Sequence, residues 1–447
     1  MAPWNQAPNP VNTANWRGDC SSLDTVISTP PEFVEFAELD DVLFLEGFEM
    51  DEDYVDGTSA NMFTRVSING TPFALQSLAA DSRLSKTGGI SLKCTANSTT
   101  SGILQFPHKV IDRTMQYFRA YFKLLSFTNT NGSERSAHIF GWTDSTGHRS
   151  TVYLSFPATS GASLKFGVAQ NTLSGAQNGT ATIALDTWYR CELTTEVLSG
   201  VGGQNSSVTI FLGDTDTVVD TISLTNAGGS FGGFPAMIAG TPNTGNEAIY
   251  LLDDVRVQTI TQTLPVTPNH SPLYGAGGVW PMYAFSDDAT LSEWTPLSGT
   301  DHFAMVDEFP TVFDDATSYV SSAGTAELTD LYNIRAYENF STVPTNTNIK
   351  AVNVRARARL VSGSSPTIKA VYVDPPSSTN WLGKASQTTG SYANYPATSS
   401  LPNLFLIYNT GLNIGFKNQQ KIGIQRVSGG SSDTVRATSV WGYMDIQ

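Results

Sequence analysis

Cysteine is scarce in this sequence, with only Cys20, Cys94 and Cys191 among 447 residues. The odd number and irregular spacing match neither a disulfide framework nor a zinc-binding pattern. We therefore predict a protein that folds in a reducing cytoplasm without disulfide bonds.

Charged residues are also few, at 15% of the chain, and basic residues are the scarcer kind: 25 Lys and Arg against 40 Asp and Glu, a net charge of -15. Nucleic-acid binders and binders of anionic membranes need a basic surface, so we expect neither partner. No apolar run approaches the ~18 residues that span a bilayer. The stretch Met1–Gln6 lacks the basic and apolar parts of a signal peptide.

Catalytic motifs are missing as well. The sequence contains no Gly-x-Ser-x-Gly, no phosphate-binding glycine loop, no paired zinc-type histidines and no Cys-x-x-Cys, and none of its five histidines has a recognisable catalytic context. We therefore predict a protein that is not an enzyme and that needs no cofactor or metal.

An acidic cluster that begins at Glu49 is the nearest approach to an active site. Glycoside hydrolysis needs paired carboxylates, and Glu49 and Asp51 alternate, but a third acidic position is missing. As a calcium loop, Asp51, Asp53 and Asp56 lack the expected spacing and a terminal bidentate glutamate. We favour a solvated acidic loop.

Short alternating stretches rich in β-branched and aromatic residues are abundant, with Gly, Ser, Thr and Asn between them. Period two is typical of strands with one buried face, and this spacing is typical of β-sandwiches. The predicted strands of the first half are Val42–Glu49, Phe63–Ile68, Ile90–Cys94, Met115–Leu125, His138–Trp142, Val152–Phe156, Leu164–Val168, Thr187–Leu193, Ser207–Leu212 and Ala248–Val257.

The last of these strands, Ala248–Val257, closes the first domain, because a segment with three prolines follows at 263–272. Ile249, Leu251, Val255 and Val257 recur with period two and predict its buried face. Asp253 interrupts that face, and Asp254 follows it. Two interpretations remain open for this pair: contact with a cation or ligand, or carboxylates held by nearby amides, which we favour.

The second half has the same pattern. Its predicted strands are Thr317–Ser322, Ala351–Leu360, Ile368–Val373, Leu404–Tyr408, Lys421–Val427 and Val435–Met444. In Ala351–Leu360 the apolar residues at even positions predict the inward face. Arg355, Arg357 and Arg359 then lie on the opposite face, either as contacts to a polysaccharide or a partner's acidic surface, or as a plain solvated face paired to acidic neighbours.

Residues 1–38 are rich in Pro, Asn and Ser and have too little apolar surface for a core of their own. Trp4, Trp16 and Phe33 are spaced along this segment, so we predict an extended docking arm with these aromatics as partner contacts. Further along, Trp142, Trp188, Trp294 and Trp441 lie in strand patterns; stacking on sugars is one fate for them, and burial in the core is the one we expect for most.

The first half resembles a concanavalin A-like, laminin-G-like jelly roll. The stretches that carry this resemblance are Leu45–Phe48, Thr187–Leu193 and Leu252–Val257. The second half is similar to a β-rich module of tailed-bacteriophage structural proteins, through Trp294–Pro296, His302–Glu308, Asp314–Ser322, Ile349–Arg359 and Gly423–Ser428.

We therefore expect an all-β chain of two antiparallel, jelly-roll-like β-sandwich domains behind an extended arm. The predicted parts are the arm at 1–38, the jelly roll at 39–260, a Pro-rich linker at 261–279 and the second sandwich at 280–447.

The resemblance implies a non-enzymatic virion component of a tailed phage, assembled in the host cytoplasm and associated with the tail at the fibre, tip or baseplate. The partners it implies are other virion proteins and further copies of the chain, with a trimer expected. A head decoration protein, a carbohydrate-binding adhesin that recognises a host surface glycan, and a polysaccharide depolymerase are the rivals.

Overall fold

A computed structural model shows an all-β protein built from antiparallel sheets, as the alternating pattern predicts. Contacts divide the chain into two compact units. The first unit comprises Asp41–Gln262 with Pro272–Val279, and the second comprises Met1–Asp40, Thr263–Ser271 and Trp280–Gln447. The structure describes residues 33–35, 43–46, 64–77, 90–106, 110–111, 115–130, 135–144, 147–170, 175–198, 203–228, 232–260, 278–307, 315, 317–336, 348–364, 366–373, 381–382, 386–395, 403–407, 412–413 and 421–446.

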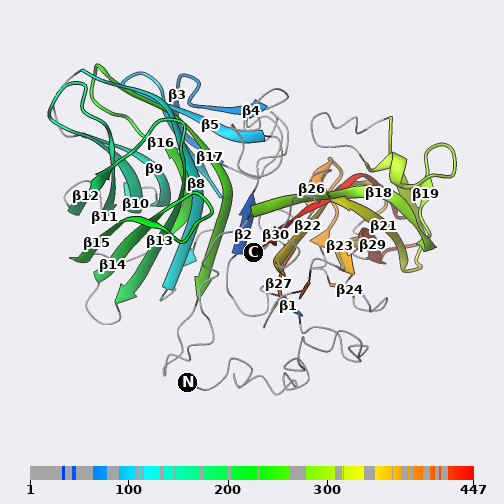
Figure 1. The fold of residues 1–447 in the computed structure, drawn as a ribbon. Coiled ribbons are helices and arrows are strands. Elements are labelled where there is room, and N and C mark those ends of the chain that lie inside the picture. Colours follow the sequence, from blue (N-terminus) through cyan, green and yellow to red (C-terminus); the bar gives the residue numbers. More distant parts are fainter. Residues whose placement is uncertain are drawn as a thin grey trace, which may run out of the picture. The chain divides into compact units, whose positions relative to one another are not determined.

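The first unit is a sandwich of two antiparallel sheets, which form two layers in Figure 1. Sheet I has the order β15 (Val218–Gly228), β14 (Gly203–Leu212), β13 (Trp188–Leu198), β8 (Met115–Asn129), β17 (Asn246–Ile260), β5 (Ile90–Asn97) and β4 (Phe73–Ser77), with β2 (Leu43–Glu46) also on β17. Sheet II has the order β12 (Gly175–Thr182), β11 (Lys165–Gln170), β10 (Gly147–Phe156), β9 (Arg135–Asp144), β16 (Gly232–Ala239), β6 (Ser101–Gln105) and β3 (Thr64–Asn69), with β7 (Val110–Ile111) on β16.

Aromatic rings from both sheets meet in the core of this sandwich. Phe118 of β8 lies with its ring centroid 4.8 Å from Phe140 and 6.2 Å from Trp142, both of β9. Phe122, two residues on, lies 5.2 Å from Phe166 of β11. Such pairs contribute about 0.5–1.5 kcal/mol beyond area burial. The period of two along β8 therefore sets which of its side chains join the sheets.

Cys94 and Cys191, the two cysteines among the described residues, are free and buried. Burial raises the pKa of both thiols far above the usual range, so both are neutral and unreactive.

The second unit is built on one long, branched antiparallel sheet. Its order is β1 (Phe33–Glu35), β27 (Asn403–Ile407), β22 (Asn348–Ser362), β30 (Thr434–Ile446), β18 (Gly278–Ser292), β21 (Leu328–Ala336), β29 (Lys421–Ser428), β23 (Thr367–Val373) and β24 (Trp381–Leu382). Short strands branch from it: β19 (Thr295–Pro296), β20 (Val320–Ala323), β25 (Ser386–Gln387), β26 (Ala393–Tyr395) and β28 (Leu412–Asn413); one 3-10 turn, η4, spans Phe303–Met305.

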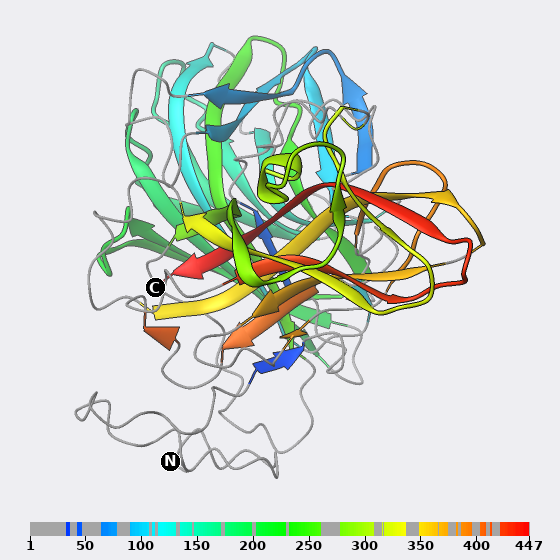
Figure 2. The ribbon, with the colours of Figure 1, turned by 90° about the vertical axis from the view of Figure 1, so that its right-hand side faces the viewer.

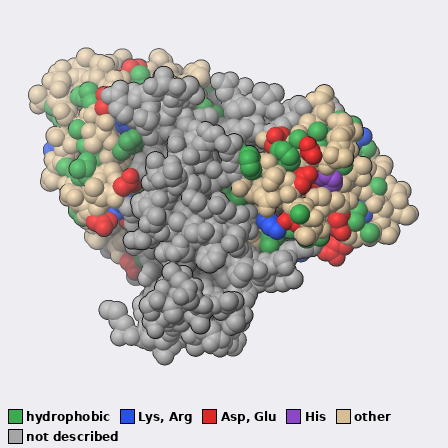
Figure 3. All heavy atoms as spheres, turned by 45° about the vertical axis from the view of Figure 1, so that its right-hand side comes forward, with side chains coloured by type: hydrophobic (Ala, Val, Ile, Leu, Met, Phe, Trp, Pro, Cys, Tyr) green, Lys and Arg blue, Asp and Glu red, His purple; other side chains and the backbone are tan. Residues whose placement is uncertain are grey.

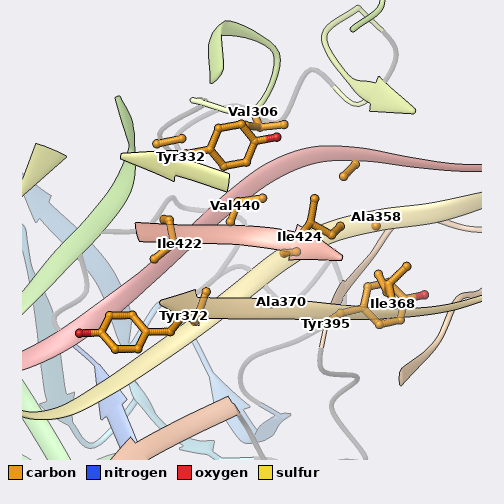
Figure 4. Packing of buried hydrophobic residues seen from close by; sticks show 14 of the residues in the cluster. Val306, Tyr332, Ala358, Ile368, Ala370, Tyr372, Tyr395, Ile422, Ile424 and Val440 are labelled. Atoms are coloured by element: carbon orange, nitrogen blue, oxygen red, sulfur yellow. The ribbon is translucent and has the colours of Figure 1, made fainter. Parts of the chain in front are cut away.

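This sheet doubles back, so that β22 and β30 face β23 and β29 across a second core. Figure 2 shows β30, in red, running beside β22, in yellow. In Figure 4, Ala358 of β22, Ile424 of β29 and Val440 of β30 come together. The predicted inward residues of β22 from Val352 to Ala358 all belong to this core, whereas Leu360 is only half-buried.

No helix in the described ranges has the length and hydropathy needed to cross a membrane.

Figure 3 shows acidic side chains on the visible surface of the described residues, in line with the excess of Asp and Glu over Lys and Arg in the sequence.

Two parts of the predicted organisation lie mostly outside the described residues. Of the predicted linker, only 278–279 are described, and β18 begins there, before the predicted domain start at 280. In the arm, Trp4 and Trp16 are not among the described residues. Phe33 begins β1, which pairs antiparallel with β27, but its side chain is not among those described.

The start of β18 generates a stability prediction for the first unit. Val279 is fully buried, and its amide donates a hydrogen bond of 2.8 Å to Oδ1 of Asp254. Burying a valine contributes roughly 1.5–3 kcal/mol. A fragment 41–279 should therefore melt several degrees above a fragment 41–262 in a thermal scan. Val279→Ala in the longer fragment should give an intermediate value. Equal melting temperatures for the two fragments would contradict this role for 272–279.

Candidate functional site

Three neighbouring strands of sheet I carry charged and aromatic side chains on the face turned away from the core; we call it the charged face. In β13, Tyr189, Cys191 and Leu193 point into the core, so Arg190 and Glu192 point outward. Across β13, β8 and β17 the register forms four rows: Thr194, Tyr117 and Gln258; Glu192, Arg119 and Arg256; Arg190, Tyr121 and Asp253; Trp188, Lys123 and Leu251.

A β-bulge in β17 determines which of its residues join these rows. The register slips between Asp253 and Arg256, and Asp254 adopts a left-handed backbone with φ of 47°. One extra residue in a strand moves the following side chains to the other face. Our prediction that Ile249, Leu251, Val255 and Val257 share one buried face was therefore wrong. Leu251 faces outward in the row of Lys123, whereas Val257 pairs with Phe118 on the core side.

Arg190 is held by a network on the charged face. Its Nε lies 2.8 Å from Oε1 of Glu192, and its guanidinium lies 4.1 Å from the ring centroid of Phe211. Nη1 donates to the carbonyl oxygen of Thr215 at 3.3 Å, and Nη2 to Oδ1 of Asp216 at 3.4 Å. The turn between β14 and β15 therefore covers this part of the face.

The same turn also contacts Tyr121, whose hydroxyl donates to Oδ1 of Asp214 at 2.9 Å. Lys123 is buried too, with its Nζ 3.8 Å from a carboxylate oxygen of Asp186 and 5.8 Å from the ring centroid of Trp188. The polar side chains in the rows of Tyr121 and Lys123 therefore bind groups of the same unit.

The rows of Tyr117 and Arg119 border a small depression with a free volume of about 10 Å³. That is the size of one water site. Its lining side chains include two guanidinium groups, one carboxylate, one amide and one phenol, contributed by Arg119, Arg256, Glu192, Gln258 and Tyr117. Arg119 and Arg256 are 4% and 3% exposed. The depression suits a small polar or anionic group.

Asp253 and Asp254 bind protein groups, as in the interpretation we favoured. Oδ2 of Asp253 accepts from the hydroxyl of Ser91 at 2.9 Å, and Oδ1 from the amide of Asp254 at 2.8 Å.

In the described part of the chain, no group of three or more His, Cys, Asp or Glu side chains could hold a metal ion. The expected absence of a metal stays a prediction.

The arginines of β22 do not form a plain solvated face. Arg355 and Arg357 are 3% and 8% exposed, and Arg359 is half-buried. Arg357 makes a bidentate pair with Asp315, with Nε 2.7 Å from Oδ1 and Nη2 2.5 Å from Oδ2. The expected acidic neighbour is present for Arg357, but solvation was wrong for Arg355 and Arg357, because alternation assigns residues to a face without showing what covers that face.

The remaining sequence candidates are dispersed. Trp142, Trp294 and Trp441 are buried, as expected for most of the tryptophans, and Trp188 is half-buried. The acidic cluster from Glu49 to Asp56 lies outside the described residues.

One buried hydrogen-bonded pair was not predicted from the sequence, because its members are 28 residues apart. Nδ1 of His302 lies 2.7 Å from Oδ2 of Asp330, which also accepts from the hydroxyl of Tyr332. Oδ1 of Asp330 accepts from the amide of Trp294 at 2.7 Å. Burial raises the pKa of Asp330, and these hydrogen bonds partly offset the rise. Since all these partners are structural, the pair anchors the loop before η4.

The network around Arg190 generates a prediction about stability. Arg190→Met removes the cation that pairs with Oε1 of Glu192, which is only 6% exposed, and breaking a buried pair of this kind costs about 3–5 kcal/mol. Lys123→Met is the matched control, because Asp186 is 73% exposed and such a pair contributes less than about 1 kcal/mol. Hydrogen exchange of β13 peptides across a urea series reports the stability of the first unit. Equal losses of unfolding free energy in Arg190→Met and Lys123→Met would contradict the larger structural role that we assign to Arg190.

Comparison with known proteins identifies no family for this chain. No protein-family profile matches it, and no curated protein matches its sequence. Peanut lectin bound to a nonapeptide is similar in structure, with 11% identity, a TM-score of 0.32 and coverage of 50% of this chain and 99% of the lectin. The catalytic domain of a GH131 β-glucanase from Podospora anserina has 14% identity, a TM-score of 0.28 and coverage of 48% and 90%. The cellulose-induced protein Cip1 has 10% identity, a TM-score of 0.30 and coverage of 46% and 94%.

Proposed function

We propose that this chain is a non-enzymatic structural component of a tailed-phage virion, associated with the tail and attached through its N-terminal arm. The resemblance of the second-half stretches to phage structural modules motivates this proposal, and the structure describes parts of these stretches within the second unit. Ile349–Arg359 lies in β22, Gly423–Ser428 in β29, and Trp294 belongs to the same core. The charged groups described above serve mainly to hold strands and turns together, as a structural role requires.

The observation that carries the attachment is β1. Phe33, Val34 and Glu35 pair antiparallel with Ile407, Leu406 and Phe405, at the end of the sheet path. An arm segment therefore adds a strand to a sheet edge, which is a common way for extended segments to dock. In a homo-oligomer the same pairing serves neighbouring copies, since exchange of an identical element costs little.

Removing the arm tests this function. We expect a chain that lacks residues 2–38 to keep the first unit folded and to be absent from purified virions, as measured by quantitative mass spectrometry. A shorter deletion, 2–30, keeps β1 and separates its contribution from that of Trp4 and Trp16. Normal copy number for the chain without residues 2–38 would place the attachment on the sandwiches instead.

A second candidate function, carbohydrate binding, is favoured by the depression on the charged face. An aromatic ring beside guanidinium, carboxylate and amide groups matches the hydroxyls and carboxylate of an acidic saccharide. The volume of about 10 Å³ does not admit a sugar ring, so binding requires the face to open. In such an adhesin the saccharide would belong to the host envelope.

A glycan array with full-length protein tests this second function. We expect signals for uronate-containing glycans that fall about tenfold or more in Arg256→Gln, since hydrogen bonds to charged groups contribute about 1.5–3 kcal/mol. Tyr117→Phe removes one hydroxyl and should lower the signal less than Arg256→Gln does. Lys165→Gln on β11 removes a positive charge elsewhere and serves as the control. The absence of any signal with the unmodified chain would exclude carbohydrate binding and leave the structural function untouched.

A further inference from the structure

Two arginines lie directly opposite each other on neighbouring strands of the second unit. Arg359 of β22 pairs in register with Arg436 of β30. Like charges that face each other across a strand pair are destabilising. Both side chains are half-buried, which reduces screening by water and raises this cost. An arrangement of this kind calls for a compensating negative charge.

Each of these guanidinium groups is fixed on a tyrosine ring. Arg436 lies 4.1 Å from the ring centroid of Tyr319, and Arg359 lies 4.7 Å from that of Tyr392. Cation–π contacts of this kind orient a guanidinium but leave its N–H groups available. The tyrosine rings therefore hold the two arginines in place, while Nε of each arginine finds no acceptor among the described residues.

Three buried polar atoms of this cluster have no hydrogen-bond partner among the described residues: Nε of Arg359, Nε of Arg436 and the hydroxyl of Tyr392. Such an atom costs roughly 1–3 kcal/mol of desolvation if nothing binds it. Tyr392 lies close to both arginines, since both act electrostatically on its phenol. Burial raises the pKa of Tyr392, and its phenol consequently remains protonated as a donor.

The carboxylate that lies against this cluster, Asp315, is already engaged. It accepts the bidentate pair from Arg357 and a hydrogen bond of 3.3 Å from the hydroxyl of Thr438. Arg357, Arg359 and Arg436 together carry three positive charges against this one negative charge. Among the described residues of this cluster the residual charge is positive, and the atoms without partners there are all donors or carry a donor hydrogen.

We propose that Arg359, Arg436 and Tyr392 form a binding site for a small oxyanion, a phosphate or a carboxylate, that bridges the two guanidinium groups. Oxyanions are the ligands that guanidinium groups bind best, through charge-assisted hydrogen bonds. The two tyrosine rings position the arginines, and the hydroxyl of Tyr392 supplies a third donor. The site lies in the second unit and is independent of both proposed functions of the chain.

Thermal scans and titration calorimetry of the full-length chain test this site. The probes are inorganic phosphate and glucuronate, each compared with chloride at the same ionic strength. We expect at least one oxyanion to raise the melting temperature of the second unit beyond the effect of chloride. A response to phosphate alone assigns a phosphate site, and a response to glucuronate alone assigns a carboxylate of a sugar acid.

Variants locate the binding. Arg359→Gln and Arg436→Gln should each weaken the affinity about tenfold or more, and Tyr392→Phe should weaken it several-fold while it preserves the ring under Arg359. Lys369→Gln, on β23 of the same unit, removes one positive charge elsewhere and should leave the affinity unchanged. The proposal is overturned if neither anion exceeds chloride, or if the response persists at full size in Arg359→Gln and Arg436→Gln.

Discussion

The bulge in β17 is the constraint on which the charged face of the first unit depends. Because the chain slips by one residue after Asp253, Arg256 turns outward beside Arg119, while Val255 and Val257 turn inward. A regular strand would place Arg256 between the two sheets, where an unpaired charge costs several kcal/mol. The left-handed Asp254 at the bulge also binds the amide of Val279, so one local irregularity fixes both a surface and a chain connection.

Both units bury arginines on the outward side of a sheet, and in each a carboxylate makes this possible. Glu192 pairs with Arg190 in the first unit, and Asp315 pairs with Arg357 in the second. A buried pair of this kind adds little net stability, but removing one member is expensive. Such pairs therefore restrict which turns and strands can lie against the face. They contribute more to the specificity of the fold than to its free energy of unfolding.

Alternation along single strands was enough to predict the class of the fold. It predicted strands at Thr187–Leu193 and Met115–Leu125, which fall in β13 and β8, and inward side chains at Val352 and Val354. It did not reveal the bulge, because an extra residue at Asp254 leaves the composition of the strand unchanged. Burial of Arg355 was equally hidden, since a period of two separates faces but carries no information about what packs on them. The pairing of His302 with Asp330 depends on tertiary contact.

The two opposed arginine pairs show how the same local motif leads to different consequences. Arg119 and Arg256 share their row with Glu192, so the sheet itself supplies a negative charge next to them. Arg359 and Arg436 have no such neighbour in register, and Asp315 already serves Arg357. Glu192 lies in the row of the first pair and also binds Arg190, and the depression beside it has room for about one water. Within the described part of the second unit the second pair keeps a positive charge, since the carboxylate beside it, Asp315, serves Arg357, and in our proposal a ligand from outside supplies the missing negative charge.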